Sequence, residues 1–304
     1  MGSKKDLILG TALWGWSIDK AAAFALLDSY YKEGFRWLDT ATNYPIDRNP
    51  EHHRLAEKML AQWAQDRKVF DLSLIVKVGS LSNDGSPVND LTPEFIRRAH
   101  GKYRTLFGTN LDGLWIHWDN RDSLENISAT LSALREVSPS QPVGLSGIRY
   151  PELYAKAGRD LDLRFRIQVK HNLLSSALAH YKGLRERSAF YAYGLNAGGL
   201  SLTPSSSESS SMRLRHIDPA VLSRLRPRIE AFIQESREAG SSRQWSTLNQ
   251  IAMLYAYGSP ELSGMIIGPS KLEQLAESIS CFRQLESRDI ESCYRKVAEM
   301  IQVV

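Results

Sequence analysis

The sequence predicts an α/β fold, a (β/α)8 TIM barrel that spans residues 1–304 as a single domain. Short apolar segments alternate with longer amphipathic ones from one end of the chain to the other. The apolar segments are continuous runs, which are typical of parallel strands buried on both faces. Eight strand–helix units can be recognised, and a closed barrel requires that number.

The first four units occupy the N-terminal part of the chain. We expect their strands at 7–10, 35–38, 72–77 and 111–117, and their helices at 20–33, at 51–65, from Thr92 onward and at 123–136. Asp19 is suited to cap the first helix and Gly34 to end it. Thr92 is a capping residue followed by proline, which is favoured in the first turn of a helix.

The last four units occupy the C-terminal part. We expect strands at 142–146, 165–169, 190–193 and 262–267, and helices near 151–157, at 176–186, 219–238 and 246–257, and one long helix from Lys271. An open doubly wound sheet is the alternative to a barrel. Such a sheet normally has a G-x-G-x-x-G segment after its first strand, and the residues from Gly10 to Gly15 lack that spacing. The barrel is therefore favoured.

Composition narrows the class of protein. The chain has 304 residues, 42% of them hydrophobic, and a net charge of +4. Because no dense stripe of Lys and Arg accompanies this charge, we do not expect nucleic-acid binding. The cysteines Cys281 and Cys293 form neither a metal-ligand pattern nor a disulfide framework, so a reducing, cytoplasmic setting is expected. Apolar runs are too short for a membrane span or a signal peptide.

The segment 201–216 is rich in serine and follows the seventh expected strand. Active sites of barrels lie at the face where strands end and helices begin. We therefore expect a mobile loop at this face, and a passive surface insertion is the alternative. A monomer and a small homo-oligomer are both compatible with the sequence.

Ionisable side chains stand where three consecutive strands end. Asp39, Lys77 and His117 each follow an apolar run, and Tyr44 lies in the polar loop after Asp39. In a barrel these strand ends converge on one mouth, so we expect the four side chains to meet. A strand-end charge is more often a structural ion pair than a catalyst, but its repetition on three successive strands favours a functional site.

The residue types in this group indicate proton transfer. A carboxylate keeps a neighbouring ammonium charged, an ammonium lowers the pKa of a nearby phenol, and an imidazole can position a carbonyl group. The set contains too few soft ligands for a metal site. It fits delivery of a proton to the oxygen of a carbonyl that is being reduced.

These residues resemble a known family. The segment LDTATNY, the strand-end lysine of LIVKVG and the strand-end histidine of LWIHWD are similar to the tetrad of the aldo-keto reductases. The resemblance continues through 143–146, 168–172, 192–194 and 266–270, and so covers nearly the whole chain. It implies that Tyr44 is the general acid, that Lys77 and Asp39 tune it, and that His117 orients the substrate.

The resemblance also implies a nicotinamide cofactor, usually NADP(H) and less often NAD(H), that lies across the barrel mouth. The positions that it assigns to the cofactor are Gly10, Thr11, Asp39, Ser146, Gln168, Tyr193, Gly268, Ser270, Lys271, Gln274 and Glu277. Gly147 and Ser278 stand where the family commonly has asparagine, and Lys271 is the evident cation for a 2′-phosphate.

The substrate pocket is less evident from the sequence. We expect Trp14 and Trp118, on loops at the mouth, to contact the substrate, and rim packing is the alternative for each. Lys170 and His171 replace the family's usual acidic–aromatic pair, either on the pocket floor or at the surface.

The function expected from these residues is NADP(H)-dependent reduction of an aldehyde or ketone, sugar-like or a secondary metabolite, to the alcohol. Three alternatives stay open. One is NAD-dependent oxidation of a polyol or aldose. Another is a regulatory subunit that binds NADPH with little turnover. The third is a biosynthetic enzyme whose bound nicotinamide is recycled during elimination or epimerisation.

Overall fold

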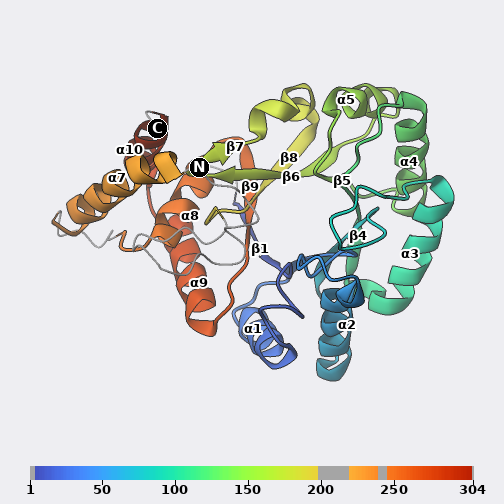
Figure 1. Ribbon diagram of the computed structural model, residues 1–304, viewed down its shortest axis with the longest axis horizontal. Helices are drawn as coiled ribbons and strands as arrows, with labels where there is room; N and C mark the ends of the chain where they lie inside the picture. The colour runs from blue at the N-terminus through green and yellow to red at the C-terminus, as the bar shows by residue number, and fades with distance from the viewer. Residues whose placement is uncertain (1–3, 198–218, 239–244, 303–304) are drawn as a thin grey trace.

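The computed structural model describes residues 4–197, 219–238 and 245–302, and it contains a closed barrel of eight parallel strands (Figure 1). Going round the barrel, each strand pairs with the next, and the last pairs back with the first. The strands are β1 (Asp6–Gly10), β2 (Trp37–Ala41), β3 (Ser73–Val78), β4 (Leu111–His117), β5 (Val143–Ser146), β6 (Phe165–Asn172), β8 (Ser188–Tyr193) and β9 (Leu262–Ile267). The predicted fold class is confirmed.

Helices surround the barrel. They are α1 (Lys20–Lys32), α2 (Leu55–Arg67), α3 (Pro93–Phe107), α4 (Leu124–Val137), α5 (Pro151–Asp160), α7 (Pro219–Glu238), α8 (Leu248–Gly258), α9 (Leu272–Ser287) and α10 (Glu291–Gln302). In Figure 1, α1 to α5 follow one another around the bottom, right and top of the view, and α7 to α10 gather at the left. The Ser-rich segment 201–216 lies outside the described residues.

Capping side chains stand at the start of three helices, and two of them, Asp19 and Thr92, were expected from the sequence. The side chains of Asp19, Thr92 and Ser123 each accept a hydrogen bond from a backbone N–H three residues further on. A side-chain oxygen at this position satisfies one of the N–H groups that the first turn leaves without an intrahelical partner.

Three expected helices differ in the structure. The helix expected at 51–65 is divided into η1 (Pro50–His52) and α2, because Arg54 between them has the left-handed φ of 69°. The segment 176–186 is instead the short strand β7 (Ser175–Ser176) and the 3₁₀ segment η3 (Leu178–Arg187). The long final helix is two helices, because Arg288 is extended at the end of α9.

The strands bury both faces, and alternate residues enter two different cores. The inner core lies inside the barrel and consists of Ile8, Ile75, Trp115 and Tyr191. Their chain neighbours, such as Leu74 and Val76, belong to the larger core between strands and helices. This alternation follows from the pleat of a strand, which directs successive side chains to opposite faces.

Charged side chains close the N-terminal end of the barrel. Arg166 Nη1 on β6 lies 2.9 Å from Asp112 Oδ2 on β4, and its guanidinium lies 5.0 Å from the ring centre of Trp37 on β2. Tyr191 donates a hydrogen bond of 3.3 Å to Asp6 on β1.

Among the described residues, no helix is both long and apolar enough to span a bilayer.

Candidate active site

The strands direct three of the four proposed catalytic side chains into the barrel. Asp39 and His117 lie two residues after Trp37 and Trp115, and Lys77 lies two residues after Ile75. Because side-chain direction repeats every two residues along a strand, these polar groups form the layer directly above the inner core. β2 extends two residues past Asp39, so this carboxylate lies within the strand rather than where it ends.

Lys77 lies at the centre of the site. Its ammonium nitrogen donates to Asp39 Oδ2 at 2.5 Å, to the Tyr44 hydroxyl at 2.9 Å and to Gln168 Oε1 at 3.2 Å. The lysine side chain is only 2% exposed. Burial works to lower the pKa of Lys77, but Asp39 and Tyr44 outweigh it and hold the pKa above its ordinary value. The ammonium is therefore charged at neutral pH.

Loop hydrogen bonds place the Tyr44 hydroxyl at Lys77. The Tyr44 backbone N–H donates to the Ala41 carbonyl at 3.1 Å, which turns the chain directly after β2. Thr42 donates from its N–H to the Lys77 carbonyl at 3.0 Å and from its hydroxyl to the Ser80 carbonyl at 3.0 Å. The loop that contains Tyr44 is thus bound to β3 and to the residues that follow it.

Burial raises the pKa of Tyr44 above its ordinary value. Lys77 lowers this pKa, as the sequence suggests, but desolvation and the charge of Asp39 have the larger combined effect. In this structure the phenol is therefore protonated at neutral pH and can act as a proton donor. The sign differs from the lowered pKa expected from the ammonium alone.

His117 is neutral at physiological pH. Burial, and then the charge of Lys77, lowers its pKa well below the ordinary value. Its ring is nearly perpendicular to that of Tyr44, with 6.2 Å between ring centres. His117 Nδ1 is buried and has no hydrogen-bond partner within the described part of the chain. A neutral imidazole beside the phenol can bind a substrate oxygen but is a poor source of protons.

Gln168 belongs to the same group, although the sequence places it only at the cofactor. Its amide nitrogen donates to Asp39 Oδ1 at 2.6 Å, and its oxygen accepts from Lys77 and, at 3.3 Å, from Ser146 Oγ. All four of these side chains are buried. The polar layer therefore extends from β2 and β3 to β5 and β6.

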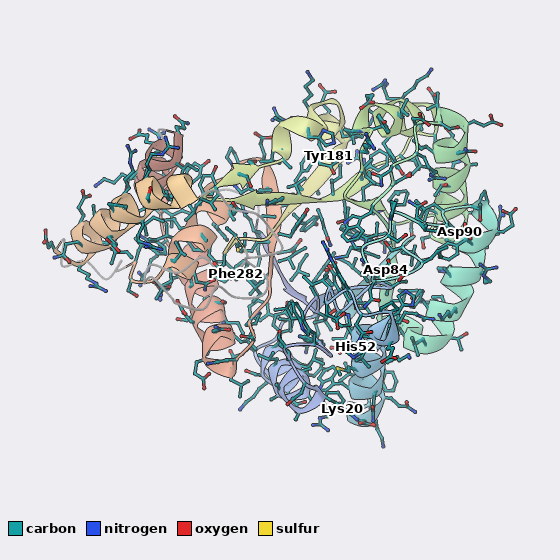
Figure 2. The ribbon with its side chains drawn as sticks, in the orientation of Figure 1. Lys20, His52, Asp84, Asp90, Tyr181 and Phe282 are labelled. Atoms are coloured by element: carbon teal, nitrogen blue, oxygen red, sulfur yellow. The ribbon has the colours of Figure 1, made fainter. Side chains whose placement is uncertain are left out.

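Trp118 lies beside the catalytic group, and the residue is 42% exposed. Its ring centre is 4.8 Å from that of His117, and the Trp118 backbone N–H donates to the Ser146 carbonyl at 2.9 Å. The loop after β5 is held in turn by Tyr181, labelled in Figure 2, whose hydroxyl accepts from the Ile148 N–H at 3.2 Å. The expected position of Trp118 at the mouth agrees with this placement.

Two other residues lie away from their expected positions. Trp14 is fully buried in the core between strands and helices, so its indole offers no surface to a ligand at the mouth. His171 is buried and stacks on Tyr255 of α8 with ring centres 4.6 Å apart, whereas its neighbour Lys170 is exposed. The pair 170–171 is thus neither a pocket floor nor a surface pair.

Apart from Asp39, Ser146 and Gln168 in the polar layer, the positions assigned to the cofactor lie in two groups. Gly10, Thr11 and Tyr193 are at the ends of β1 and β8, and the Thr11 hydroxyl lies 2.9 Å from that of Thr40 on β2. The second group is the start of α9. There the Ser270 N–H and hydroxyl donate to Gln274 Oε1 at 2.8 and 3.0 Å.

Helix α8 adds residues that the sequence did not suggest. Thr247 donates a hydrogen bond to Glu277, and Asn249 donates from its amide to Ser278 Oγ at 3.1 Å. Asn249 also accepts from Asn196, in the loop after β8, at 3.0 Å. An amide group is therefore present beside Ser278 although position 278 itself lacks one. Nothing local in the sequence links 249 to 278.

Comparison with known proteins places this geometry in a family. A family model described as "Aldo/keto reductase family" matches residues 6–298. The chain belongs to the aldo/keto reductase family. Members of this family are oxidoreductases that act on carbonyl or alcohol groups, and they generally bind nicotinamide cofactors.

A curated relative is a Saccharomyces cerevisiae protein named "Putative aryl-alcohol dehydrogenase AAD6". It is 27% identical to this aldo/keto reductase over 159 residues, which cover 48% of this chain and 70% of the yeast protein. Among its described residues, this aldo/keto reductase has no group of three or more His, Cys, Asp or Glu side chains that could hold a metal ion.

Proposed function

We propose that this aldo/keto reductase reduces an aldehyde or ketone with NADP(H), and that Tyr44 donates the proton. The proposal depends mainly on one observation. The Tyr44 hydroxyl lies 2.9 Å from the buried ammonium of Lys77, and Asp39 lies 2.5 Å from the same ammonium. This is the arrangement that a phenol needs to give up a proton and remain stabilised as its anion.

A nicotinamide held at the barrel mouth would supply a hydride to the carbonyl carbon of the substrate. As that carbon gains the electron pair, the carbonyl π bond opens and its oxygen takes the proton from Tyr44, which gives the alcohol and a tyrosinate. Lys77 stabilises the tyrosinate until solvent returns a proton. His117, being neutral, holds the carbonyl oxygen in place and does not supply the proton.

The residues present fit a nicotinamide dinucleotide. Ser146 and Gln168 offer a hydroxyl and an amide beside the catalytic layer, and Tyr193 on β8 lies close enough to affect Tyr44 electrostatically. At Gly268, an added Cβ would meet no described atom within 4 Å. Helix α9 begins at Leu272, and its N-cap residue Lys271 provides no side-chain cap, so the first-turn N–H groups and the lysine suit a phosphate.

The substrates that we propose are small aldehydes and ketones, with aromatic aldehydes among them. The exposed indole of Trp118 beside His117 offers a flat apolar face on which an aromatic ring can stack. The name of the yeast relative points to the same class of alcohol. Sugar-like aldehydes and ketones are also to be assayed, because the catalytic layer itself does not select between aromatic and sugar-like substrates.

Replacing Tyr44 by phenylalanine tests the proposal. We expect Tyr44→Phe to lower kcat for NADPH-dependent reduction by at least about a hundredfold, because the general acid is lost. The dissociation constant for NADPH, measured by fluorescence, should change by less than about twofold. Tyr31→Phe, which alters a tyrosine bonded to Asp71 on the outer surface, is the matched control and should keep wild-type turnover.

Near-normal turnover in Tyr44→Phe would contradict the assigned role. Wild-type protein that binds NADPH tightly but turns over none of a broad carbonyl and alcohol panel would instead favour the regulatory alternative. Assays in both directions with NADP(H) and NAD(H) separate reduction from polyol or aldose oxidation.

A further inference from the structure

We propose that Gln168 is a positioning residue for proton transfer: by binding Asp39 and Lys77 together, it holds the ammonium against Tyr44. This inference rests on the function proposed above. It gives Gln168 a second role, separate from contact with the cofactor, and it predicts that the amide sets the pH at which the site works.

Gln168 supplies one of three acceptors for the Lys77 ammonium. An ammonium has three N–H donors. The three acceptors here are Asp39 Oδ2 on β2, the Tyr44 hydroxyl and Gln168 Oε1 on β6. Because the lysine side chain is only 2% exposed, bulk water does not readily replace a missing acceptor. Gln168 therefore completes the set that determines where the ammonium lies.

Gln168 also binds the Asp39 carboxylate. One of its oxygens accepts from Lys77 and the other from the Gln168 amide at 2.6 Å. A buried carboxylate oxygen without a donor is unfavourable. If the amide were removed, Lys77 would be the available donor for both oxygens. Moving toward Asp39 Oδ1 would take the ammonium away from the phenol.

The amide can serve both roles through different atoms. Gln168 Oε1 has two acceptor sites, and Lys77 and Ser146 occupy them. The amide nitrogen has two N–H groups, and Asp39 accepts one of them. The other N–H remains for a ligand. Contact with a cofactor and support of Lys77 are therefore separable by experiment.

The surroundings of Tyr44 make the Lys77 contact decisive. Burial, Asp39 and Tyr193 all raise the pKa of Tyr44, and Lys77 opposes them. His117 faces the phenol from β4 but is neutral, because burial lowers its pKa well below the ordinary value. A longer distance between Lys77 and Tyr44 should therefore raise the pKa of the phenol further.

The test measures kcat against pH for oxidation of an alcohol with NADP⁺, in which Tyr44 must first lose its proton. We expect Gln168→Met to move the midpoint of this profile upward by about one pH unit, a tenfold change in the acidity of the phenol. Ser146→Ala is the matched control. It removes the other neighbour of the amide oxygen and should weaken NADP⁺ binding without moving the midpoint.

Gln168→Glu provides an independent check. When protonated, the introduced carboxyl group can donate to Asp39 Oδ1 and accept from Lys77, as the amide does. For carbonyl reduction, in which Tyr44 starts protonated, we expect kcat of Gln168→Glu to be close to that of the wild type at low pH and to fall as the introduced group ionises. If Gln168→Met does not fold, as judged by circular dichroism, this pH dependence decides the question.

An unchanged midpoint in Gln168→Met, together with weaker NADP⁺ binding, would overturn the inference and leave Gln168 as a cofactor contact alone. If the wild type shows no turnover with any substrate, the proposed function fails instead. The inference is then tested directly from the ultraviolet difference spectrum of tyrosinate between each protein and its Tyr44→Phe counterpart. A pKa of Tyr44 that is the same with and without Gln168 would refute it.

Discussion

Gly147 determines where the indole of Trp118 lies. The glycine has a φ of 71°, and a Cβ built on it would lie 2.4 Å from Trp118 Cδ1. Trp118 itself has a φ of 55°, which is uncommon for a bulky residue, and Asn89 donates to its carbonyl at 3.0 Å. Steric packing therefore explains why position 147 is glycine in this chain, because the absence of a Cβ leaves room for the indole beside His117.

Substitution at 147 tests this packing. We expect Gly147→Ala to lower the free energy of unfolding by about 1–2 kcal/mol, because alanine is strained at positive φ and its methyl group displaces the indole. kcat/KM for aromatic aldehydes should also fall. In a Trp118→Ala background, the part of the stability loss that comes from displacing the indole should disappear. Denaturant unfolding of the wild type, the two single variants and the double variant measures this. Equal losses in both backgrounds would mean that the indole is not involved.

Lys271 is the residue on which the choice between NADP(H) and NAD(H) is proposed to depend. It stands at the start of α9, where its charge and the first-turn N–H groups favour an anion. We expect Lys271→Ala to raise the dissociation constant for NADPH about tenfold and that for NADH by less than about twofold. Fluorescence titration with both cofactors measures this, and equal changes would remove the assignment to a 2′-phosphate.

At the scale of elements, the contact between β6 and α8 depends on His171. This histidine stacks on Tyr255 and bonds Ser176 Oγ at 2.9 Å through Nδ1. Burial, and then the charge of Lys5, lowers the pKa of His171 to about 4. β6 is three residues longer than expected because this buried ring and the pairing with β7 continue the strand past Val169.

The lowered pKa makes stability depend on pH. Between about pH 6.5, where a histidine in the unfolded chain titrates, and pH 4, the unfolded chain binds the proton and the folded chain does not. The free energy of unfolding should therefore fall as pH falls through this window, by up to about 3 kcal/mol from His171. His171→Phe keeps an aromatic ring on Tyr255 but cannot titrate. Its unfolding free energy, measured in urea, should fall less over the same window, and identical slopes would contradict the prediction.

At the scale of the whole molecule, the two ends of the barrel have different roles, one in chemistry and the other in stability. The polar layer of Asp39, Lys77 and Gln168 lies toward the mouth, and the pair of Arg166 and Asp112 lies at the opposite end. The apolar inner core separates them. In barrels of this type, chemistry is located at the mouth, and the opposite end contributes to stability.

This division predicts that stability and activity can be changed separately. Arg166→Met leaves Asp112 without its cation, and we expect it to lower the unfolding free energy by about 2 kcal/mol. kcat should remain within about twofold of the wild type. The double substitution Arg166→Met/Asp112→Asn should recover part of the stability, because no unpaired charge remains. A large loss of kcat in correctly folded Arg166→Met would show that the two ends are coupled.

The sequence by itself was sufficient for the architecture. Continuous apolar runs and capping residues such as Asp19 and Thr92 are local features, and they located the eight strands and most helix starts. The order Asp39, Lys77 and His117 on successive strands then predicted their meeting, because barrel topology brings adjacent strand ends together. The helix breaks at Arg54 and Arg288 were not predicted, because arginine is not a residue type that indicates a turn.

Only the tertiary structure decided which residues each buried polar group contacts and in which direction its pKa is shifted. Gln168 binds Asp39 from 129 residues away in the sequence, and the burial of Trp14 and His171 depends on neighbours that no local pattern reveals. The direction of the pKa shift at Tyr44 likewise depends on residues that are distant in the sequence. It results from desolvation and two opposed charges, and these depend on distances that exist only once the barrel has closed.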